Sequence, residues 1–276
     1  MGGLRAASPS VAGSRAVAGV GSDYAAQRLA MACVLASEAA TVLAVMRRNV
    51  RWADVRYGGA GDDEHLDHPL VAGLKALRRR AAAWGHGRWT GVEPLLYLRP
   101  FLDVVRSDET GAPITGAALS SLHKILTLDL VGPGAPGAAE AMAAVVDAVT
   151  ACRFEVIDPA SEEAVLARVL QVLLACVRSR AALALANRHV CTIVNTCFRV
   201  VQQAGTKGEL LQRVSRQTMQ EVIRTVFARL QDIDVTALSD EQMEVSEWQV
   251  LIKSGKPKVA SFLPSREKTR GTKRVL

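Results

Sequence analysis

The stretch from Asp158 to Val177 constrains the fold more than any other part of this sequence. It opens with a helix start: Asp158 can cap, Pro159 takes the first helical position, and Glu162 and Glu163 favour the positive end of the helix dipole. Leucines recur along one side of this helix and valines along the next, so it is apolar nearly all round. A helix of this kind is buried on most of its surface. We therefore expect it at the centre of a helical fold.

Further helices are expected on both sides of this central helix, because apolar residues recur at spacings of three and four. The first helix shows an apolar stripe made of Leu29, Cys33, Ala36, Ala40 and Leu43. No strand pattern separates the helices, and 49% apolar but only 4% aromatic residues favour helices over a β-sandwich. We predict an all-α fold, an α-solenoid of stacked antiparallel helices of the armadillo or HEAT type. The expected helices span about 23–50, 69–84, 93–106, 115–129, 142–149, 158–177, 187–204 and 208–231.

Polar segments divide the chain into regions. Residues 1–22 contain two arginines and no acid, which predicts a disordered leader, with an organellar transit peptide as the alternative. Residues 53–67 are rich in glycine and acids and predict a mobile loop. The helical domain is expected over 23–233, and residues 234–276 are expected to form a basic disordered tail.

The net charge of +7 lies in this tail, because residues 253–276 contain eight basic residues and one acid. A neutral body with a basic tail lacks the folded basic face that nucleic-acid binding needs, so we expect no nucleic-acid partner. We expect weak contact of the tail with anionic membranes instead. No membrane-spanning segment is expected, because even the most apolar stretch, 162–186, carries several charges.

A metal site is one chemical alternative. His65 and His68, together with Asp63 and Glu64, offer imidazole and carboxylate ligands. They lie in the predicted polar loop and have no cysteine partner, so a solvated loop is the favoured interpretation. We expect no metal site.

The five cysteines indicate structural thiols. They form no C-x-x-C pair and each lies in an apolar stretch, which indicates buried, reduced thiols of a cytosolic protein. Cys191 and Cys197 near His189 match core packing better than a nucleophile. The sequence also lacks a phosphate-binding glycine loop and a hydrolase motif, so we expect no enzyme activity and no cofactor.

A polar segment between two apolar helices is the best candidate for recognition. It consists of Arg106, Ser107, Asp108, Glu109 and Thr110. Beyond it, Thr115 is expected to cap the next helix, with Ile114 as a hydrophobic staple. An ordinary connection with a good cap is the alternative. Polar loops on a rigid helical frame are common recognition sites.

Five long segments resemble a known family. They are VMRRNVRW (45–52), YLRPFLDVVRSDETGAPITGAALSSLHKIL (97–126), CRFEVIDPASEEAVLARVLQVLLAC (152–176), HVCTIVNTCFRVV (189–201) and GELLQRVSRQTM (208–219). These segments closely resemble the dimerisation and cyclophilin-binding (DCB) domain, which opens the large ARF guanine-nucleotide exchange factors of the Golgi brefeldin-resistance class. The segments resemble the plant GNOM-like members in particular, and the resemblance runs from about residue 25 to 233.

The resemblance implies a cytosolic protein that visits Golgi or endosomal membranes in vesicle-mediated transport. It also implies a homodimer, contacts with downstream domains of a full-length exchange factor and, in plants, binding of a cyclophilin. After about residue 235 the chain departs from the family pattern, so the exchange domain and its catalytic glutamate are expected to have no counterpart in this sequence. A regulatory domain is the main interpretation, and a free-standing α-solenoid adaptor for the same partners is the alternative.

Two charged residues are candidates for the dimer interface. Lys124 lies in the otherwise apolar helix 115–129, where a cation has to reach solvent or meet a carboxylate. Glu163 lies in the first turn of the central helix, and both residues fall in segments that resemble the family. We predict that they pair across a two-fold interface, with two ordinary surface charges as the alternative.

Overall fold

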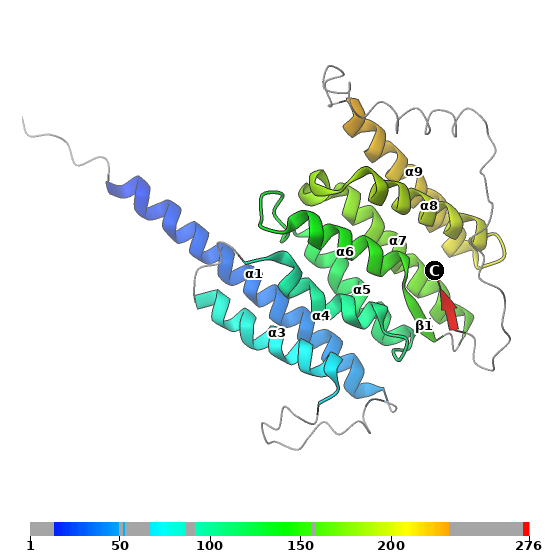
Figure 1. Ribbon diagram of the computed structural model, residues 1–276, viewed down its shortest axis with the longest axis horizontal. Coiled ribbons are helices and arrows are strands. Elements are labelled where there is room, and N and C mark those ends of the chain that lie inside the picture. The colour runs from blue at the N-terminus through cyan, green and yellow to red at the C-terminus, as the bar shows by residue number, and fades with distance from the viewer. Residues whose placement is uncertain are drawn as a thin grey trace, which may run out of the picture.

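The computed structural model describes residues 14–49, 52, 67–86, 92–155, 158–231 and 273–275, and its helices stack side by side (Figure 1). The all-α prediction is confirmed, because the described residues are almost entirely helical. In chain order the helices are α1 (Ser14–Arg48), α3 (Pro69–His86), α4 (Pro94–Arg106), α5 (Ala112–Thr127), α6 (Ala138–Thr150), α7 (Pro159–Arg178), the short 3₁₀ helix η2 (Arg180–Ala184), α8 (Asn187–Ala204) and α9 (Glu209–Gln231).

The helices form two layers. One layer runs through α1, α5, α7 and α9, and the other runs through α3, α4, α6 and α8, because each helix packs on the next member of its own layer. Consecutive helices such as α8 and α9 also pack against each other across the layers. This order is the one expected of stacked helix pairs. Membership of the armadillo or HEAT type of solenoid stays a prediction.

Helix α7 occupies the centre of the stack, as its sequence predicts. It packs against α5 and α9 within its layer and against α6 and α8 across it. The predicted cap is confirmed, because the Asp158 carboxylate accepts the Ser161 N–H at 2.8 Å and the Ser161 hydroxyl at 2.5 Å. These hydrogen bonds hold the pKa of Asp158 below its usual value.

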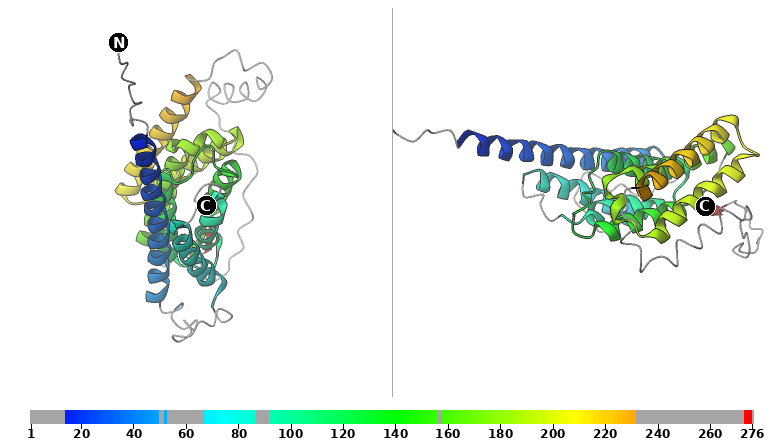
Figure 2. Two further views of the ribbon diagram at one scale, coloured as in Figure 1. Left: turned by 90° about the vertical axis from the view of Figure 1, so that its left-hand side faces the viewer. Right: turned by 90° about the horizontal axis from the view of Figure 1, so that it is seen from above.

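Helix α1 differs from the prediction at two points. It begins at Ser14 rather than near Asp23, so part of the predicted leader is helical, and Figures 1 and 2 show its first half projecting beyond the other helices. The predicted apolar stripe is also wrong in part, because Leu29 and Cys33 are exposed. Small apolar side chains occupy several sides of α1, so a spacing of three and four fits more than one face. The buried stripe is Ala32, Leu35, Ala39, Val42, Leu43 and Met46.

The segment Leu29–Arg48 of α1 is long and apolar enough to cross a membrane, judged by length and composition alone. Such a segment was not expected from the sequence. In the structure this part of α1 packs against α3 and α5, and its single acid, Glu38, is bonded within that contact. Packing in the core accounts for only part of its apolar composition, because 39% of the segment is buried.

Helix α5 starts earlier than predicted. Gly111 is the N-cap residue, and its carbonyl oxygen accepts the N–H groups of Ile114 and Thr115 at 3.0 and 3.1 Å. Thr115, the predicted cap, lies inside the helix and is fully buried. The physical reason is Pro113, which favours the first turn of a helix because its missing N–H needs no partner there.

A two-stranded sheet was not expected from the sequence. Strand β1 (Arg153–Glu155) pairs antiparallel with β2 (Lys273–Val275), so three residues of the predicted disordered tail form a strand. Phe154 points into the core while Arg153 is exposed, which is the alternation of a strand. The rest of the predicted tail, the predicted mobile loop from 53 to 66 and residues 1–13 lie outside the described residues.

Candidate interaction surface

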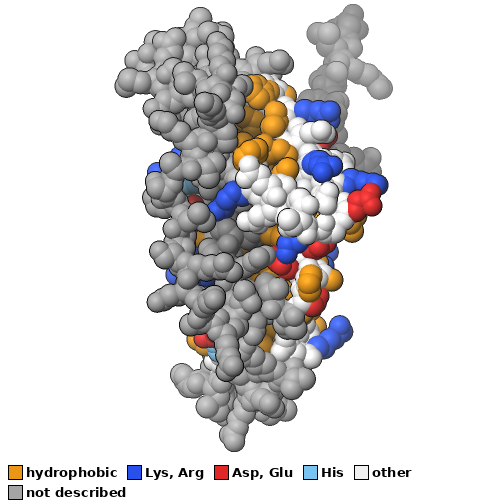
Figure 3. Space-filling model, turned by 90° about the vertical axis from the view of Figure 1, so that its right-hand side faces the viewer, with side chains coloured by type: hydrophobic (Ala, Val, Ile, Leu, Met, Phe, Trp, Pro, Cys, Tyr) orange, Lys and Arg blue, Asp and Glu red, His pale blue; other side chains and the backbone are white. Residues whose placement is uncertain are grey.

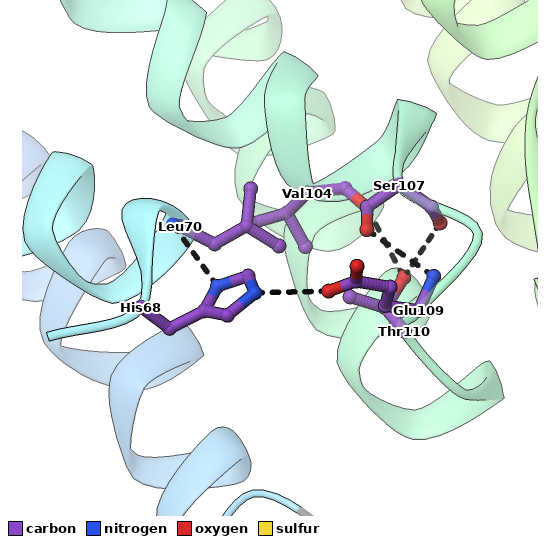
Figure 4. Close-up of polar contacts among 6 residues, drawn as sticks. All are labelled: His68, Leu70, Val104, Ser107, Glu109 and Thr110. Carbon is purple, nitrogen blue, oxygen red and sulfur yellow. Dashed lines mark hydrogen bonds and ion pairs between the residues drawn. The ribbon is translucent and has the colours of Figure 1, made fainter. Parts of the chain in front are cut away.

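The predicted recognition segment is a rigid connection between α4 and α5. Thr110 is fully buried, and its hydroxyl lies 3.2 Å from the Val104 carbonyl oxygen and 3.1 Å from the Ser107 carbonyl oxygen (Figure 4). The same hydroxyl bonds the Thr115 hydroxyl at 2.9 Å. Ser107 also accepts the Glu109 N–H at 3.3 Å through its own hydroxyl. Thr110 and Ser107 therefore fix the shape of the loop.

The loop is joined to the start of α3 through His68. Nε2 of His68 lies 2.9 Å from Glu109 Oε2, and Nδ1 accepts the Leu70 N–H at 3.3 Å (Figure 4). Because Nδ1 is the acceptor, the proton lies on Nε2, which donates to Glu109. The His68 ring stands edge-on to Trp52, with ring centroids 4.7 Å apart and planes at 75°. This contact positions the Glu109 carboxylate at the surface.

Three of the five predicted recognition residues present charge to solvent. Arg106, Asp108 and Glu109 are exposed, whereas Ser107 is half-buried and Thr110 is buried. Arg106 ends α4 and reaches α6, where its guanidinium donates to the Ala144 carbonyl oxygen at 3.1 Å. The segment thus separates into a buried anchor and a displayed charged surface.

Lys124 has a partner inside the chain. Its ammonium lies 2.6 Å from Oε1 of Glu38, which is buried in α1. Ser121, one turn before Lys124, donates its hydroxyl to Oε2 of the same carboxylate at 2.9 Å. This contact joins α5 to α1 and was not predicted from the sequence.

Glu163 also has a partner inside the chain. Oε1 of Glu163 accepts the Gly208 N–H at 2.8 Å, just before α9 begins. A Cβ atom at Gly208 would lie 2.7 Å from Oε2 of this carboxylate, so a larger residue there would force the end of the Glu163 side chain to shift. The neighbouring Glu162 is buried and pairs with Lys207 at 2.7 Å. Together these bonds hold the α8–α9 turn on the start of α7, and neither was foreseen.

The structure leaves the predicted pairing of Lys124 with Glu163 across a dimer interface untested, because it contains one copy of the chain. The original reason for the pairing was that Lys124 needs a carboxylate partner. That reason is weaker now, because Lys124 and Glu163 are both bonded within the chain. The pairing stays a prediction.

The buried cysteines are poor nucleophiles. Burial raises the pKa of the thiols of Cys152, Cys176 and Cys197 to about 12 in each case, so the reactive thiolate is scarce at neutral pH. Cys191 is half-buried, and Cys33 is exposed, so the prediction that every thiol is buried is wrong for Cys33. Among the described residues no group of three His, Cys, Asp or Glu side chains could hold a metal ion, and His65 lies outside them.

Comparison with known proteins identifies the family. Residues 95–234, which cover α4 to α9 and half of the chain, match the dimerisation and cyclophilin-binding domain described as Mon2/Sec7/BIG1-like. The chain belongs to the DCB domain family. The recognition loop, Lys124 and Glu163 all lie inside the matched part of this DCB domain.

Several plant proteins are similar to this DCB domain. The ARF guanine-nucleotide exchange factor GNOM of Arabidopsis thaliana is 58% identical over 206 residues, which cover 75% of this chain and 14% of that protein. Its relative GNL1 is 57% identical over 201 residues, covering 73% of this chain and 14% of that protein. The Golgi-specific brefeldin A-resistance guanine nucleotide exchange factor 1 homolog of Caenorhabditis elegans is 34% identical over 140 residues, covering 50% of this chain and 7% of that protein. The chain therefore spans a small part of these relatives.

Proposed function

We propose that this chain is a self-associating regulatory domain of a large ARF guanine-nucleotide exchange factor, acting in vesicle transport at Golgi or endosomal membranes. The observation that carries the proposal is the match of residues 95–234 to the DCB family together with the identity of 58% to GNOM. The domain works from the cytosol, by peripheral contact with the membrane. Its partners are a second copy, the downstream domains of a full-length factor and a cyclophilin.

The alternative function is a free-standing adaptor. The similarity to plant exchange factors favours the regulatory domain, because a similar sequence forms part of much longer proteins there. Co-purification tests the choice. A regulatory domain is expected to be recovered with a full-length exchange factor from the same cells, whereas an adaptor is recovered with trafficking proteins but without that factor.

The displayed part of the recognition loop is the proposed contact surface for partners. This part consists of three exposed residues, Arg106, Asp108 and Glu109. The buried Thr110 holds the loop in place through its hydrogen bonds to backbone carbonyl oxygens. A rigid charged loop loses little conformational entropy on binding. The double variant Asp108→Lys with Glu109→Lys is expected to weaken partner binding while keeping the circular dichroism spectrum. If this variant still binds the full-length factor, a cyclophilin and a second copy as the wild-type chain does, the loop is not part of the contact surface.

Self-association is tested by light scattering of the purified chain, which is expected to give the mass of a dimer. Lys124→Glu and Glu163→Lys are the variants of the predicted interface pair. Lys124→Glu also places a second carboxylate beside the buried Glu38, so a loss of dimer could follow from a damaged fold.

A matched variant separates the two causes. Adding Glu38→Lys to Lys124→Glu restores opposite charges between α1 and α5, although it places the cation at the buried position. If this double variant regains native thermal stability but stays monomeric, Lys124 acts at the interface. If stability and dimer return together, the charge acts within the chain only.

We further propose that these 276 residues do not accelerate nucleotide release from ARF, because their family match is confined to the DCB domain. Release of a fluorescent guanine nucleotide from ARF is expected to proceed at the spontaneous rate with micromolar protein. Faster release would contradict the proposal.

A further inference from the structure

The outer surface of the last helix pair, α8 and α9, keeps apolar side chains in contact with solvent. Phe198 is 39% exposed, Ile223 is 38% exposed and Phe227 is 49% exposed. Half-buried Val194 and Met219 lie at the edge of the core on the same two helices. Figure 3 looks onto the side of the molecule where α8 and α9 lie and shows orange apolar side chains at its surface. We call this surface the end face.

The end face also carries positive charge. On α9, Arg216, Ile223 and Phe227 are seven and four residues apart, so they lie on one side of the helix. Arg216 donates to the side-chain oxygen of Gln212 at 3.3 Å rather than to a carboxylate. Arg199 and Arg213 are exposed, and Arg213 forms a surface ion pair with Glu209 at 3.4 Å. A hollow of about 380 Å³ lies along this part of α9 and is lined by Glu209, Gln212, Arg213, Arg216, Gln217 and Gln220.

A segment that lies outside the described residues has the complementary composition. Residues 236–252 contain four acids and no lysine or arginine. Apolar residues recur at spacings of seven, three and four, the period of an amphipathic helix. The acids are Asp240, Glu241, Glu244 and Glu247, and the apolar positions are Leu238, Val245, Trp248 and Ile252.

We propose that residues 238–252 dock on the end face of the same molecule. The apolar positions cover Phe198, Ile223 and Phe227, and the acids lie toward Arg213 and Arg216. Opposite charges around an apolar contact specify its orientation. This docking does not depend on the proposed function of the domain.

The chain is long enough for this contact. Helix α9 ends at Gln231, and the seven residues up to Leu238 can span roughly 23–25 Å. Phe227 lies about 6 Å and Arg216 about 22 Å from the end of α9, at a rise of ~1.5 Å per residue. The outer side of α9 from Phe227 to Arg216 is therefore within reach of Leu238, and the residues that follow Leu238 extend further. Because a short linker tethers the segment to α9, its effective concentration at the end face is on the order of millimolar.

Hydrogen exchange of the full chain, followed by mass spectrometry, tests the proposal. The amides of residues 240–252 are expected to exchange about tenfold more slowly than in an unstructured peptide of the same sequence. Two substitutions should each abolish this protection: Phe227→Asp, which changes the end face, and Trp248→Asp, which changes the segment. The matched control is Leu96→Asp on α4, which exposes 46% of its side chain away from α8 and α9 and should leave the protection unchanged.

The charge complementarity has its own test. Arg213→Glu with Arg216→Glu should reduce the protection, and the further changes Glu244→Lys and Glu247→Lys should restore part of it. Absence of protection in the wild-type chain would overturn the proposal, as would protection that survives both Phe227→Asp and Trp248→Asp. Protection of α8 and α9 that rises with protein concentration and persists in Trp248→Asp would assign the end face to a second copy instead, which also overturns it.

Discussion

The contact of α1 with α5 and the contact of α7 with the α8–α9 turn both contain a buried glutamate paired with a lysine, but they bury the lysine to different degrees. At the first contact the side chain of Glu38 is 9% exposed and that of Lys124 is 53% exposed. At the second, the side chain of Glu162 is 8% exposed and that of Lys207 is 17% exposed. Water can therefore reach the cation in the first pair and is largely excluded from both groups in the second.

This difference decides what the loss of each lysine costs. Water can partly replace Lys124, and Ser121 still donates to Glu38 when the lysine is removed. The loss of Lys207 takes the cation away from a glutamate whose side chain is only 8% exposed, and breaking a buried ion pair costs far more than losing a surface ion pair. The C-terminal contact is therefore more sensitive to the loss of its cation than the N-terminal contact.

The largest expected effect follows from Lys207→Met, which keeps most of the side-chain volume and removes the charge. We expect a loss of about 3 kcal/mol in the free energy of unfolding, because the buried Glu162 loses its paired lysine. Urea unfolding followed by circular dichroism measures it. The matched control Lys124→Met is expected to cost roughly 1 kcal/mol or less, since its head group is half exposed. Equal losses in the two variants would show that burial of the lysine does not set the cost of its removal.

Removal of the acid from the first contact is the next effect in size. Glu38→Ala is expected to cost about 2 kcal/mol, because it leaves the buried Ser121 hydroxyl without its acceptor and opens space in the contact of α1 with α5. The same unfolding measurement checks it. Combining Glu38→Ala with Ser121→Ala should cost less than the sum of the two single changes, because the unsatisfied hydroxyl is then removed. Additive losses would show that the hydroxyl does not depend on Glu38.

Local sequence patterns predicted the helices but not the side-chain contacts between them. Helix α7 and its Asp158 cap were predicted because the cap, the proline and the apolar residues all lie within a few turns. The buried side of α1 was not predicted correctly, because alanine and valine lie on several sides of the helix and make the spacing of its apolar residues ambiguous. Strand β1 was missed because three residues are too few to show an alternating pattern.

The candidate site divides in the same way. The position of the loop was predicted from its polar composition between two apolar helices. The partners of its residues were not, because His68 and Glu109 are 41 residues apart and Lys124 and Glu38 are 86 apart. One signal was present, since Glu38 is the only acid between Asp23 and Asp54. A lone acid in an apolar helix indicates a buried pair with a distant cation.

A smaller effect, which depends on pH, is expected at the start of α7. The two Ser161 bonds lower the pKa of Asp158, so its contribution to stability is present above the usual value of about 3.8 and is lost as the pH falls through the lowered value. Asp158→Ala should lower the melting temperature at pH 7. The difference from the wild-type chain should shrink as the pH falls below 3.8. A difference that stays constant down to pH 2.5 would contradict capping by the ionised carboxylate.

The smallest effect is expected at the displayed end of the loop, which contrasts with both buried pairs because solvent reaches its charge freely. The Glu109 side chain is 62% exposed, and Gln retains an oxygen that can accept from Nε2 of His68. Glu109→Gln is therefore expected to change the free energy of unfolding by no more than about 0.5 kcal/mol in urea titrations. A loss above ~1 kcal/mol would show that Glu109 helps to hold the loop in place, as Thr110 and Ser107 do. Because Thr110 holds the loop by separate bonds, a loss of partner binding in a stable Glu109→Gln protein can be assigned to the carboxylate itself.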